Sequence, residues 1–306
     1  MGKYINPFSD YGFKKLFGEE ACKPQLIDLL NALLPPAGAD FIKDITFKNN
    51  EQLAESTADR KAIFDIYYEN ERGEKFIVEL QKARQDFFKE RTIYYSTFPI
   101  REQVEQGEWL FDLKAVYCIG ILDFAFKDYA HNEPEEKKVV HYVKLKDQDG
   151  KTFYDKLTYV YVEMPKFLKK EDELETRLDK WLFFINNLED LQQIPQIFAH
   201  DMVFETAFTK AELSKFTRED YERYVFSQKD YYDLRNVVNS ATREAMEKGL
   251  QEGISIGEHN KEKYAEEKAR EKQIEMAINC LKAGLDISVI ATLTGLDPEE
   301  IRKIKY

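Results

Sequence analysis

The chain has 306 residues, which is enough for one large domain with an appendage. A hydrophobic content of 43% and an aromatic content of 14% can fill a core, which excludes a mainly disordered chain. A formal net charge of −12 argues against a strongly basic nucleic-acid binder, although a local basic face could still meet a nucleic acid.

The cysteines and the apolar runs indicate the compartment. Cys22, Cys118 and Cys280 are isolated and form no C-x-x-C pair, so we expect no zinc site. Isolated cysteines in a chain of this size favour a reducing compartment. Residues 1–6 contain no apolar signal core, and the longest apolar run, 115–122, is too short to span a bilayer. We therefore predict a cytoplasmic protein without a membrane partner.

The N-terminal third begins with two helical patterns. Residues 7–17 predict a short helix that Ser9 or Asp10 would cap, and Asp10 and Lys14 have the spacing of a helical ion pair. Residues 24–34 predict an amphipathic helix, which two prolines end. The alternating residues 44–54 predict the first strand.

Residues 61–81 predict a β-hairpin with strands near 61–69 and 75–82, because two alternating apolar runs flank a polar turn that contains Gly73. Asp65 interrupts the first apolar strand, and Glu79 interrupts the second, with Gln81 on the same face as Glu79. A carboxylate in a half-buried strand is costly unless something compensates its charge. A divalent cation does so, since Mg²⁺ binds one or two carboxylates and keeps several waters.

Asp65 followed by Glu79-x-Gln81 on the next strand resembles the PD-(D/E)XK nuclease superfamily. In that superfamily an Asp and an (Asp/Glu)-x-Lys on adjacent strands hold the metal, so Gln81 stands where Lys is usual. Three segments together, 7–17, 76–81 and 91–96, resemble the Rpn family of recombination-promoting nucleases, which are also labelled transposases. The resemblance covers most of the chain.

The resemblance implies an α/β, restriction-endonuclease-like mixed central sheet flanked by helices. It implies a metal-dependent endonuclease that cleaves DNA, with a link to recombination or transposition. Asp65, Glu79 and the backbone carbonyl of Leu80 would hold Mg²⁺, for which Mn²⁺ could substitute. Asp10 is a further candidate ligand, and the alternative is an N-cap or an exposed ion pair. Gln81 could orient a water by hydrogen bonding.

The charge that the missing lysine would supply has two candidate sources, Lys61 and Lys82. Residues 82–105 predict a helix that is the most basic part of the core, and a phosphate backbone could lie along it. The alternative is a solvated helix face, and Tyr95 could equally belong to the core. The predicted nucleic-acid contacts are Lys82, Lys89, Arg91 and Tyr95.

The remaining chain first completes the sheet and then becomes helical. The predicted strands are 114–122, 139–146 and 157–163, and the predicted helices are 171–188, 195–203, 204–213 and 218–226. A long charged helix is expected from about residue 231. In the last segment, Ala291, Gly295 and Ile301 have helix-turn-helix spacing, so DNA binding competes with packing or dimerisation as its role.

We therefore predict three parts: a nuclease-like domain at 1–230, a charged helical arm at 231–273 and a small helical unit at 274–306. The expected partners are DNA and a second copy of the chain in a homo-oligomer, without a small-molecule cofactor. The rival hypothesis is a catalytically inactive adaptor that keeps the nuclease fold. Asp65 and Glu79 favour the enzyme, whereas the net charge and Gln81 favour the adaptor.

Overall fold

The computed structural model describes residues 2–34, 42–52, 62–84, 87–104, 110–126 and 137–305. Within these residues the chain forms two compact units, Met1–Val238 and Asn239–Tyr306. The predicted three-part division at residues 230 and 273 remains a prediction. None of the described helices combines the length and the apolarity that crossing a lipid bilayer requires.

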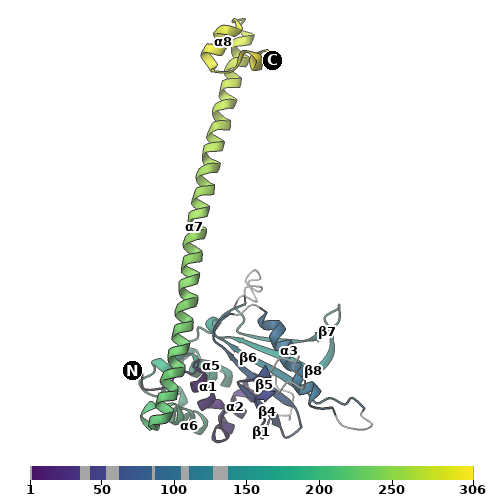
Figure 1. The fold of residues 1–306 in the computed structure, drawn as a ribbon, viewed down its shortest axis with the longest axis vertical. Coiled ribbons are helices and arrows are strands. Elements are labelled where there is room, and N and C mark those ends of the chain that lie inside the picture. Colours follow the sequence, from purple (N-terminus) through teal and green to yellow (C-terminus); the bar gives the residue numbers. More distant parts are fainter. Residues whose placement is uncertain are drawn as a thin grey trace. The chain divides into compact units, whose positions relative to one another are not determined.

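The strands of the first unit are β1 (Ile45–Phe47), β2 (Glu51–Gln52), β3 (Ala62–Ile63), β4 (Ile66–Asn70), β5 (Lys75–Gln81), β6 (Val116–Leu122), β7 (Val140–Lys146) and β8 (Thr152–Glu163). Six of these described strands form one sheet in the order β1-β4-β5-β6-β8-β7 (Figure 1). The pairs β5–β6 and β6–β8 are parallel, and the other pairs are antiparallel. Strands β2 and β3 pair separately. The mixed sheet with its flanking helices confirms the predicted fold class.

The helices of the first unit are α1 (Asp10–Phe17), α2 (Lys23–Leu33), α3 (Phe88–Arg101), α5 (Arg177–Asn187), α6 (Met202–Ala211) and the start of α7 (Arg218–Lys282). Short 3₁₀ turns lie at Glu20–Cys22, Met164–Lys166, Glu171–Glu173, Leu188–Asp190, Gln196–Phe198 and Leu213–Lys215. On one face of the sheet, Val78 and its neighbours join a core with α1, α2, α5 and α6. On the other face, Ile77 joins a smaller core with α3. Successive residues of β5 therefore serve opposite faces, as the pleat requires.

A tight turn sets the register of β4 and β5. Gly73 has a φ of 78°, a left-handed conformation that glycine adopts without strain. The Asn70 Oδ1 accepts hydrogen bonds from the N–H groups of Arg72 and Glu74, both at 3.0 Å. As a result Ile66 lies opposite Val78, and the register carries the next pair of residues, Asp65 and Glu79, toward each other.

The predicted continuous strand 61–69 is wrong, because the chain bends between β3 and β4. The side chain of Phe64 is buried in the α3-side core together with Tyr67, rather than on the face of Ile66. The bend has a physical reason across the hairpin. The Leu80 N–H donates to the carboxylate of Asp65, so a side chain occupies the place where a strand backbone would continue.

Several predicted helix bounds are also wrong. The predicted helix 171–188 begins only at Arg177, and most of the predicted helix 195–203 is not α-helical, because it contains a 3₁₀ turn at Gln196–Phe198 before α6 begins at Met202. Helix α3 begins at Phe88, so Lys82 and Arg84 lie in the irregular segment before it. The predicted helix at 218–226 and the long charged helix form a single helix, α7. Tertiary contacts hold its first turns: the Tyr224 hydroxyl accepts from the Asn6 N–H at 2.9 Å, and the Tyr231 hydroxyl donates to Asp123 at 2.8 Å.

The second unit contains the rest of α7 with α8 (Ile287–Thr294) and α9 (Pro298–Lys303). Its small core contains Ala277, Ile290, Leu296 and Ile301. The turn between α8 and α9 matches the sequence pattern, since Gly295 has a φ of 71° and Asp297 accepts from the Glu299 N–H at 2.8 Å. DNA binding by this unit remains one of the two roles left open above.

Candidate metal centre

Asp65 and Glu79 come into direct contact at the start of β4. The Asp65 N–H donates to Glu79 Oε1 over 3.3 Å between N and O. The Leu80 N–H donates in turn to Asp65 Oδ2 at 2.7 Å. Both carboxylates therefore lie in one small site, and backbone N–H groups of the hairpin fix them.

Negative charge is costly in this site. Glu79 is only 9% exposed. Burial, and after it the neighbouring charge of Asp65, raise the pKa of Glu79 from 4.5 to about 8. Burial likewise raises the pKa of Asp65, although the hydrogen bond from the Leu80 N–H opposes this shift. Two adjacent, poorly compensated carboxylates are a place where a bound cation lowers the free energy.

The donor set fits magnesium better than a metal that needs a full protein cage. Among the described residues, no group of three or more His, Cys, Asp and Glu side chains could hold a metal ion. A two-carboxylate site suits Mg²⁺, which keeps several of its waters, whereas structural zinc takes four protein ligands. The role of the Leu80 carbonyl remains a prediction.

Asp10 lies close to this centre but already has a partner. Ser9, not Asp10, caps α1, because the Ser9 hydroxyl accepts from the Gly12 N–H. The carboxylate of Asp10 is half-exposed and forms an ion pair with Lys14 at 2.9 Å. The charge of Asp10 nevertheless raises the pKa of Asp65, and Lys14 lowers it. The ion pair is thus formed, and metal binding by Asp10 remains a prediction.

Gln81 lies two residues after Glu79 on the same face of β5 and is 8% exposed. Its side-chain N–H donates to the Ala83 carbonyl at 2.9 Å, and its Oε1 accepts from the guanidinium of Arg91. That guanidinium stacks over the rings of Phe88 and Tyr95, with 5.2 and 5.8 Å to the centroids. Its charge also lowers the pKa of Glu79. The start of α3 therefore brings a cation to the carboxylates.

Gly120 lies where α3 packs on the sheet, with Phe88 as a neighbour. It lies beside Glu79 in the parallel pair β5–β6. A Cβ at this position would lie 3.2 Å from Tyr161 and 3.3 Å from Leu122, which is tighter than ordinary van der Waals contact, and 3.4 Å from Phe88. A glycine here avoids these close contacts.

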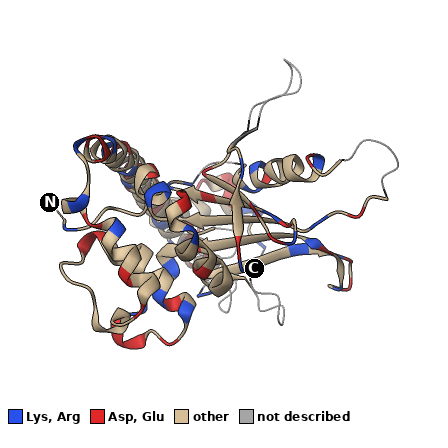
Figure 2. Cartoon of the chain, turned by 90° about the horizontal axis from the view of Figure 1, so that it is seen from below, with Lys and Arg blue, Asp and Glu red and all other residues tan. Residues whose placement is uncertain are grey.

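The other predicted nucleic-acid contacts also touch protein. The ammonium of Lys89 lies 4.9 Å from the ring centroid of Phe126. Tyr95 is half-buried and makes an edge-to-face contact with Phe64, with 5.2 Å between the ring centroids. Figure 2 shows Lys and Arg interspersed with Asp and Glu over the helices. Contacts of Lys82, Lys89, Arg91 and Tyr95 with nucleic acid remain predictions, and Lys61 lies outside the described residues.

A groove of about 680 Å³ opens next to the acids. Asp10 and Lys82 line it, and their charges act on the pKa of Asp65, so the groove and the carboxylates are neighbours. The first turns of α7 form its other wall with Glu222, Arg223, Phe226, Ser227 and Asp230. Sequence reasoning missed this wall, because nothing local in the α7 sequence indicates which helix it faces.

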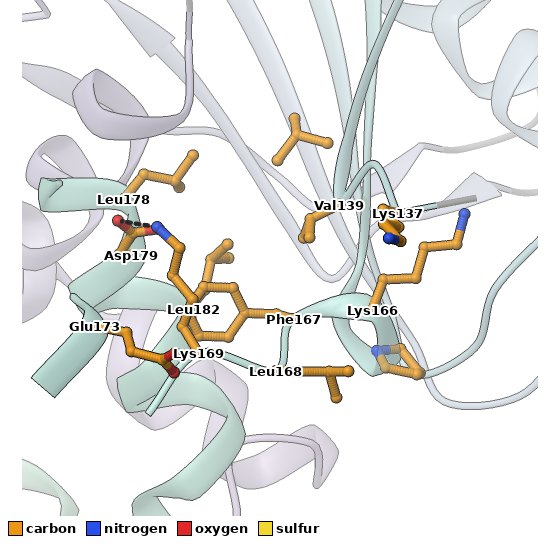
Figure 3. A pocket seen from close by; sticks show the side chains of 12 residues that line it. Lys137, Val139, Lys166, Phe167, Leu168, Lys169, Glu173, Leu178, Asp179 and Leu182 are labelled. Atoms are coloured by element: carbon orange, nitrogen blue, oxygen red, sulfur yellow. Dashed lines mark hydrogen bonds and ion pairs between the residues drawn. The ribbon is translucent and has the colours of Figure 1, made fainter. Parts of the chain in front are cut away.

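A second pocket of about 670 Å³ lies elsewhere in the first unit (Figure 3). Its lining is mainly apolar and includes Phe167 and Leu168. Two of its cations are paired: Lys169 with Asp179 at 2.9 Å and Lys166 with the buried Glu163. Neither Asp65 nor Glu79 lines this pocket, so it is not part of the candidate metal centre.

Comparison of the sequence with known protein families identifies the family to which this chain belongs. Residues 7–241 match a family model described as PD-(D/E)XK nuclease family transposase. The chain belongs to this family. The match confirms the predicted resemblance and supports a nuclease- or transposase-related function, and nucleases of this family generally use divalent metals. No curated protein and no solved structure matches the chain.

Sequence reasoning also missed the contact between Gln81 and Arg91. It treated Gln81 as a residue that orients water and Arg91 as a contact to nucleic acid. One signal was present: a glutamine in a buried strand needs hydrogen-bond partners, and the following helix is rich in donors.

Proposed function

We propose that the chain is a magnesium-dependent endonuclease that hydrolyses phosphodiester bonds of DNA. One observation carries the proposal: Asp65 and Glu79 lie in contact in a site where burial disfavours their charge. Membership of a nuclease family gives this pair its chemical meaning. Recombination or transposition would be the biological setting.

In this proposal Asp65 and Glu79 hold the cation together with the carbonyl of Leu80. A bound divalent cation acidifies a water and neutralises charge on the attacked phosphate. The chain itself orients the two acids, because the N–H groups of Asp65 and Leu80 each bind the carboxylate across the hairpin. Fixing the ligands before substrate arrives lowers the reorganisation that the reaction requires.

The groove beside Asp10 supplies the approach for the substrate strand. The groove has a volume of about 680 Å³, and its lining includes Lys82, whose charge acts on Asp65. Lys89 at the start of α3 offers a second cation for the phosphate backbone. DNA contacts along this path are local, which is compatible with a net charge of −12 for the whole chain.

The test is nicking of supercoiled plasmid by the purified full chain with Mg²⁺, with Mn²⁺ and with EDTA. Asp65→Asn and Glu79→Gln keep the side-chain shapes and remove one charged ligand each, so we expect each to reduce cleavage at least about 100-fold. Asp149→Asn, in the exposed turn between β7 and β8, is the matched control and should cut like wild type.

Equal cleavage by Asp65→Asn, Glu79→Gln and wild type would place the activity elsewhere and refute the proposal. Absence of cleavage in all proteins, on DNA and on a parallel RNA substrate, would favour the inactive adaptor. Cleavage of RNA alone would keep the metal site and replace the substrate.

A further inference from the structure

The motif position that usually carries lysine is the starting point. Gln81 occupies it, and both ends of its amide already bind protein: the nitrogen binds the Ala83 carbonyl and the oxygen binds Arg91. The side chain is also buried. An amide held in this way positions a neighbour, and it carries no charge of its own.

Arg91 brings the charge to the same place from another element. Its guanidinium contacts Gln81 and is flanked by the rings of Phe88 and Tyr95. Three neighbours thus hold a half-buried cation at the edge of the site. Planar stacking together with a directed hydrogen bond suits a guanidinium and would not suit an ammonium as well.

Lys82 is the other described candidate for the missing charge, and its position differs. It lines the groove, and its charge acts on Asp65. Arg91 instead acts on Glu79 and touches the residue that replaces the motif lysine. Of the two, Arg91 therefore stands where the motif lysine would act.

We propose that Arg91 is the catalytic cation of this nuclease and that Gln81 is its positioning residue. This inference rests on the proposed function. In the hydrolysis, a water oxygen bonds to phosphorus, and the phosphorus–oxygen ester bond breaks with its electron pair on the leaving oxygen. The water's proton passes to solvent, and the leaving oxygen takes up one proton. Arg91 stabilises the negative charge on the phosphate oxygens during this exchange, and it cannot serve as the base, because a guanidinium does not give up its proton in proteins.

If the proposal holds, a positive charge at position 81 can replace the positive charge of Arg91. Arg91→Ala should lower kcat at least about 100-fold, as the loss of one charged donor at a transition state does. Gln81→Lys places the ammonium against Arg91, so the single variant should cut less well than wild type. The double variant Gln81→Lys with Arg91→Ala removes the repulsion, restores the usual motif, and should regain at least about tenfold over Arg91→Ala.

The experiment measures kcat and KM on a labelled duplex, DNA affinity in EDTA, and thermal melting of the metal-free full chain. Arg101→Ala, at the far end of the same helix, is the matched control. Arg91→Lys keeps the charge without the fork and should retain intermediate activity. DNA affinity of Arg91→Ala in EDTA should stay within about threefold of wild type, since the residue acts on the transition state.

Three results overturn the proposal. If Arg91→Ala keeps the kcat of wild type but binds DNA more weakly in EDTA, Arg91 is a contact to the phosphate backbone of DNA. Arg91 would be a structural residue if the double variant fails to regain activity and its melting temperature is as low as that of Arg91→Ala. Normal kcat and binding in Arg91→Ala would remove it from the site. Glu79→Gln in the same assay distinguishes failure of the proposed function from failure of the proposed role of Arg91. An active Glu79→Gln protein refutes the metal site. An inactive Glu79→Gln protein beside an active Arg91→Ala protein refutes only the role of Arg91.

Discussion

Replacing Glu79 by Gln should stabilise the metal-free protein, even though Glu79 is buried. The pKa of Glu79 is about 8, against an ordinary value of 4.5, so the folded state holds a proton that the unfolded chain has lost between these pH values. Stability therefore falls as the pH rises from about 4.5 to about 8. Gln keeps the oxygen that accepts from the Asp65 N–H and removes the charge.

The magnitude follows from the same difference. A pKa of about 8 instead of 4.5 sets an upper limit of about 5 kcal/mol on the penalty above pH 8. Local rearrangement and water reduce such penalties in real proteins, so we expect a gain of about 1 to 3 kcal/mol. For a unit of this size that gain raises the melting temperature by roughly 3 to 10 °C at pH 8.5, and by little at pH 5.

Thermal melting in EDTA, at a series of pH values, measures this effect. Adding Mg²⁺ should raise the melting temperature of wild type and leave that of Glu79→Gln nearly unchanged, because only wild type keeps both ligands. Glu163→Gln is the matched control of opposite sign. Glu163 is buried with Lys166 and His141, so its replacement by an amide removes the negative charge that compensates Lys166 and should cost about 3 kcal/mol.

The result that refutes this reasoning is a Glu79→Gln protein that melts no higher than wild type at pH 8.5 without metal. The pair of acids would then contribute to folding, as a structural network does, and the adaptor hypothesis would gain. An equal stabilisation at pH 5 and at pH 8.5 would show that the gain in stability does not come from removing the charge of Glu79.

Two further predictions concern the surroundings of the centre. Lys89→Ala should weaken DNA binding and reduce the steepness of log affinity against log salt concentration by about one. Lys151→Ala, in the exposed β7–β8 turn, is the control and should change neither quantity. An unchanged slope for Lys89→Ala would exclude a contact between Lys89 and phosphate. Gly120→Ala should cost about 1 to 2 kcal/mol, because its Cβ would press on Tyr161 and Phe88, and it should lower cleavage by moving the turn that carries Arg91; melting and cleavage identical to wild type would show that α3 adapts without cost.

The central strands could be predicted from the sequence because their signals are local. Strand β5 and the buried strand β6 follow from alternation and from an uninterrupted apolar run, and their predicted bounds lie within two residues of the observed ones. The break at Asp65 could not be predicted in this way. It depends on a hydrogen bond across the hairpin, from the Leu80 N–H to a side chain.

The helix boundaries show the same limit. The sequence predicts a helix at 218–226 and another from about residue 231, but not that they form the single helix α7. That continuity depends on Tyr224 and Tyr231, which bind partners far away in the sequence. At α3, the prediction began at Lys82, whereas the helix starts after Phe87, whose φ of 60° turns the chain. Periodicity identifies a helix more reliably than it identifies its first residue.

The candidate site divides along the same line. The motif spacing placed Asp65 and Glu79 on neighbouring strands, and the structure brings them into contact. The partner of Gln81 could not be deduced from the spacing, because Arg91 belongs to another element, α3, and motif spacing on a strand does not predict how a helix packs against it.

The Leu80 amide belongs to the sheet and to the site at once. In a continuous hairpin a backbone carbonyl would accept its proton, and here the Asp65 carboxylate does so. Asp65 thus carries two separable duties, an acceptor for the strand and a charge for the cation. Asparagine preserves the first and abolishes the second, whereas alanine removes both. Loss of activity in an alanine variant alone would therefore mix a folding defect with a chemical one.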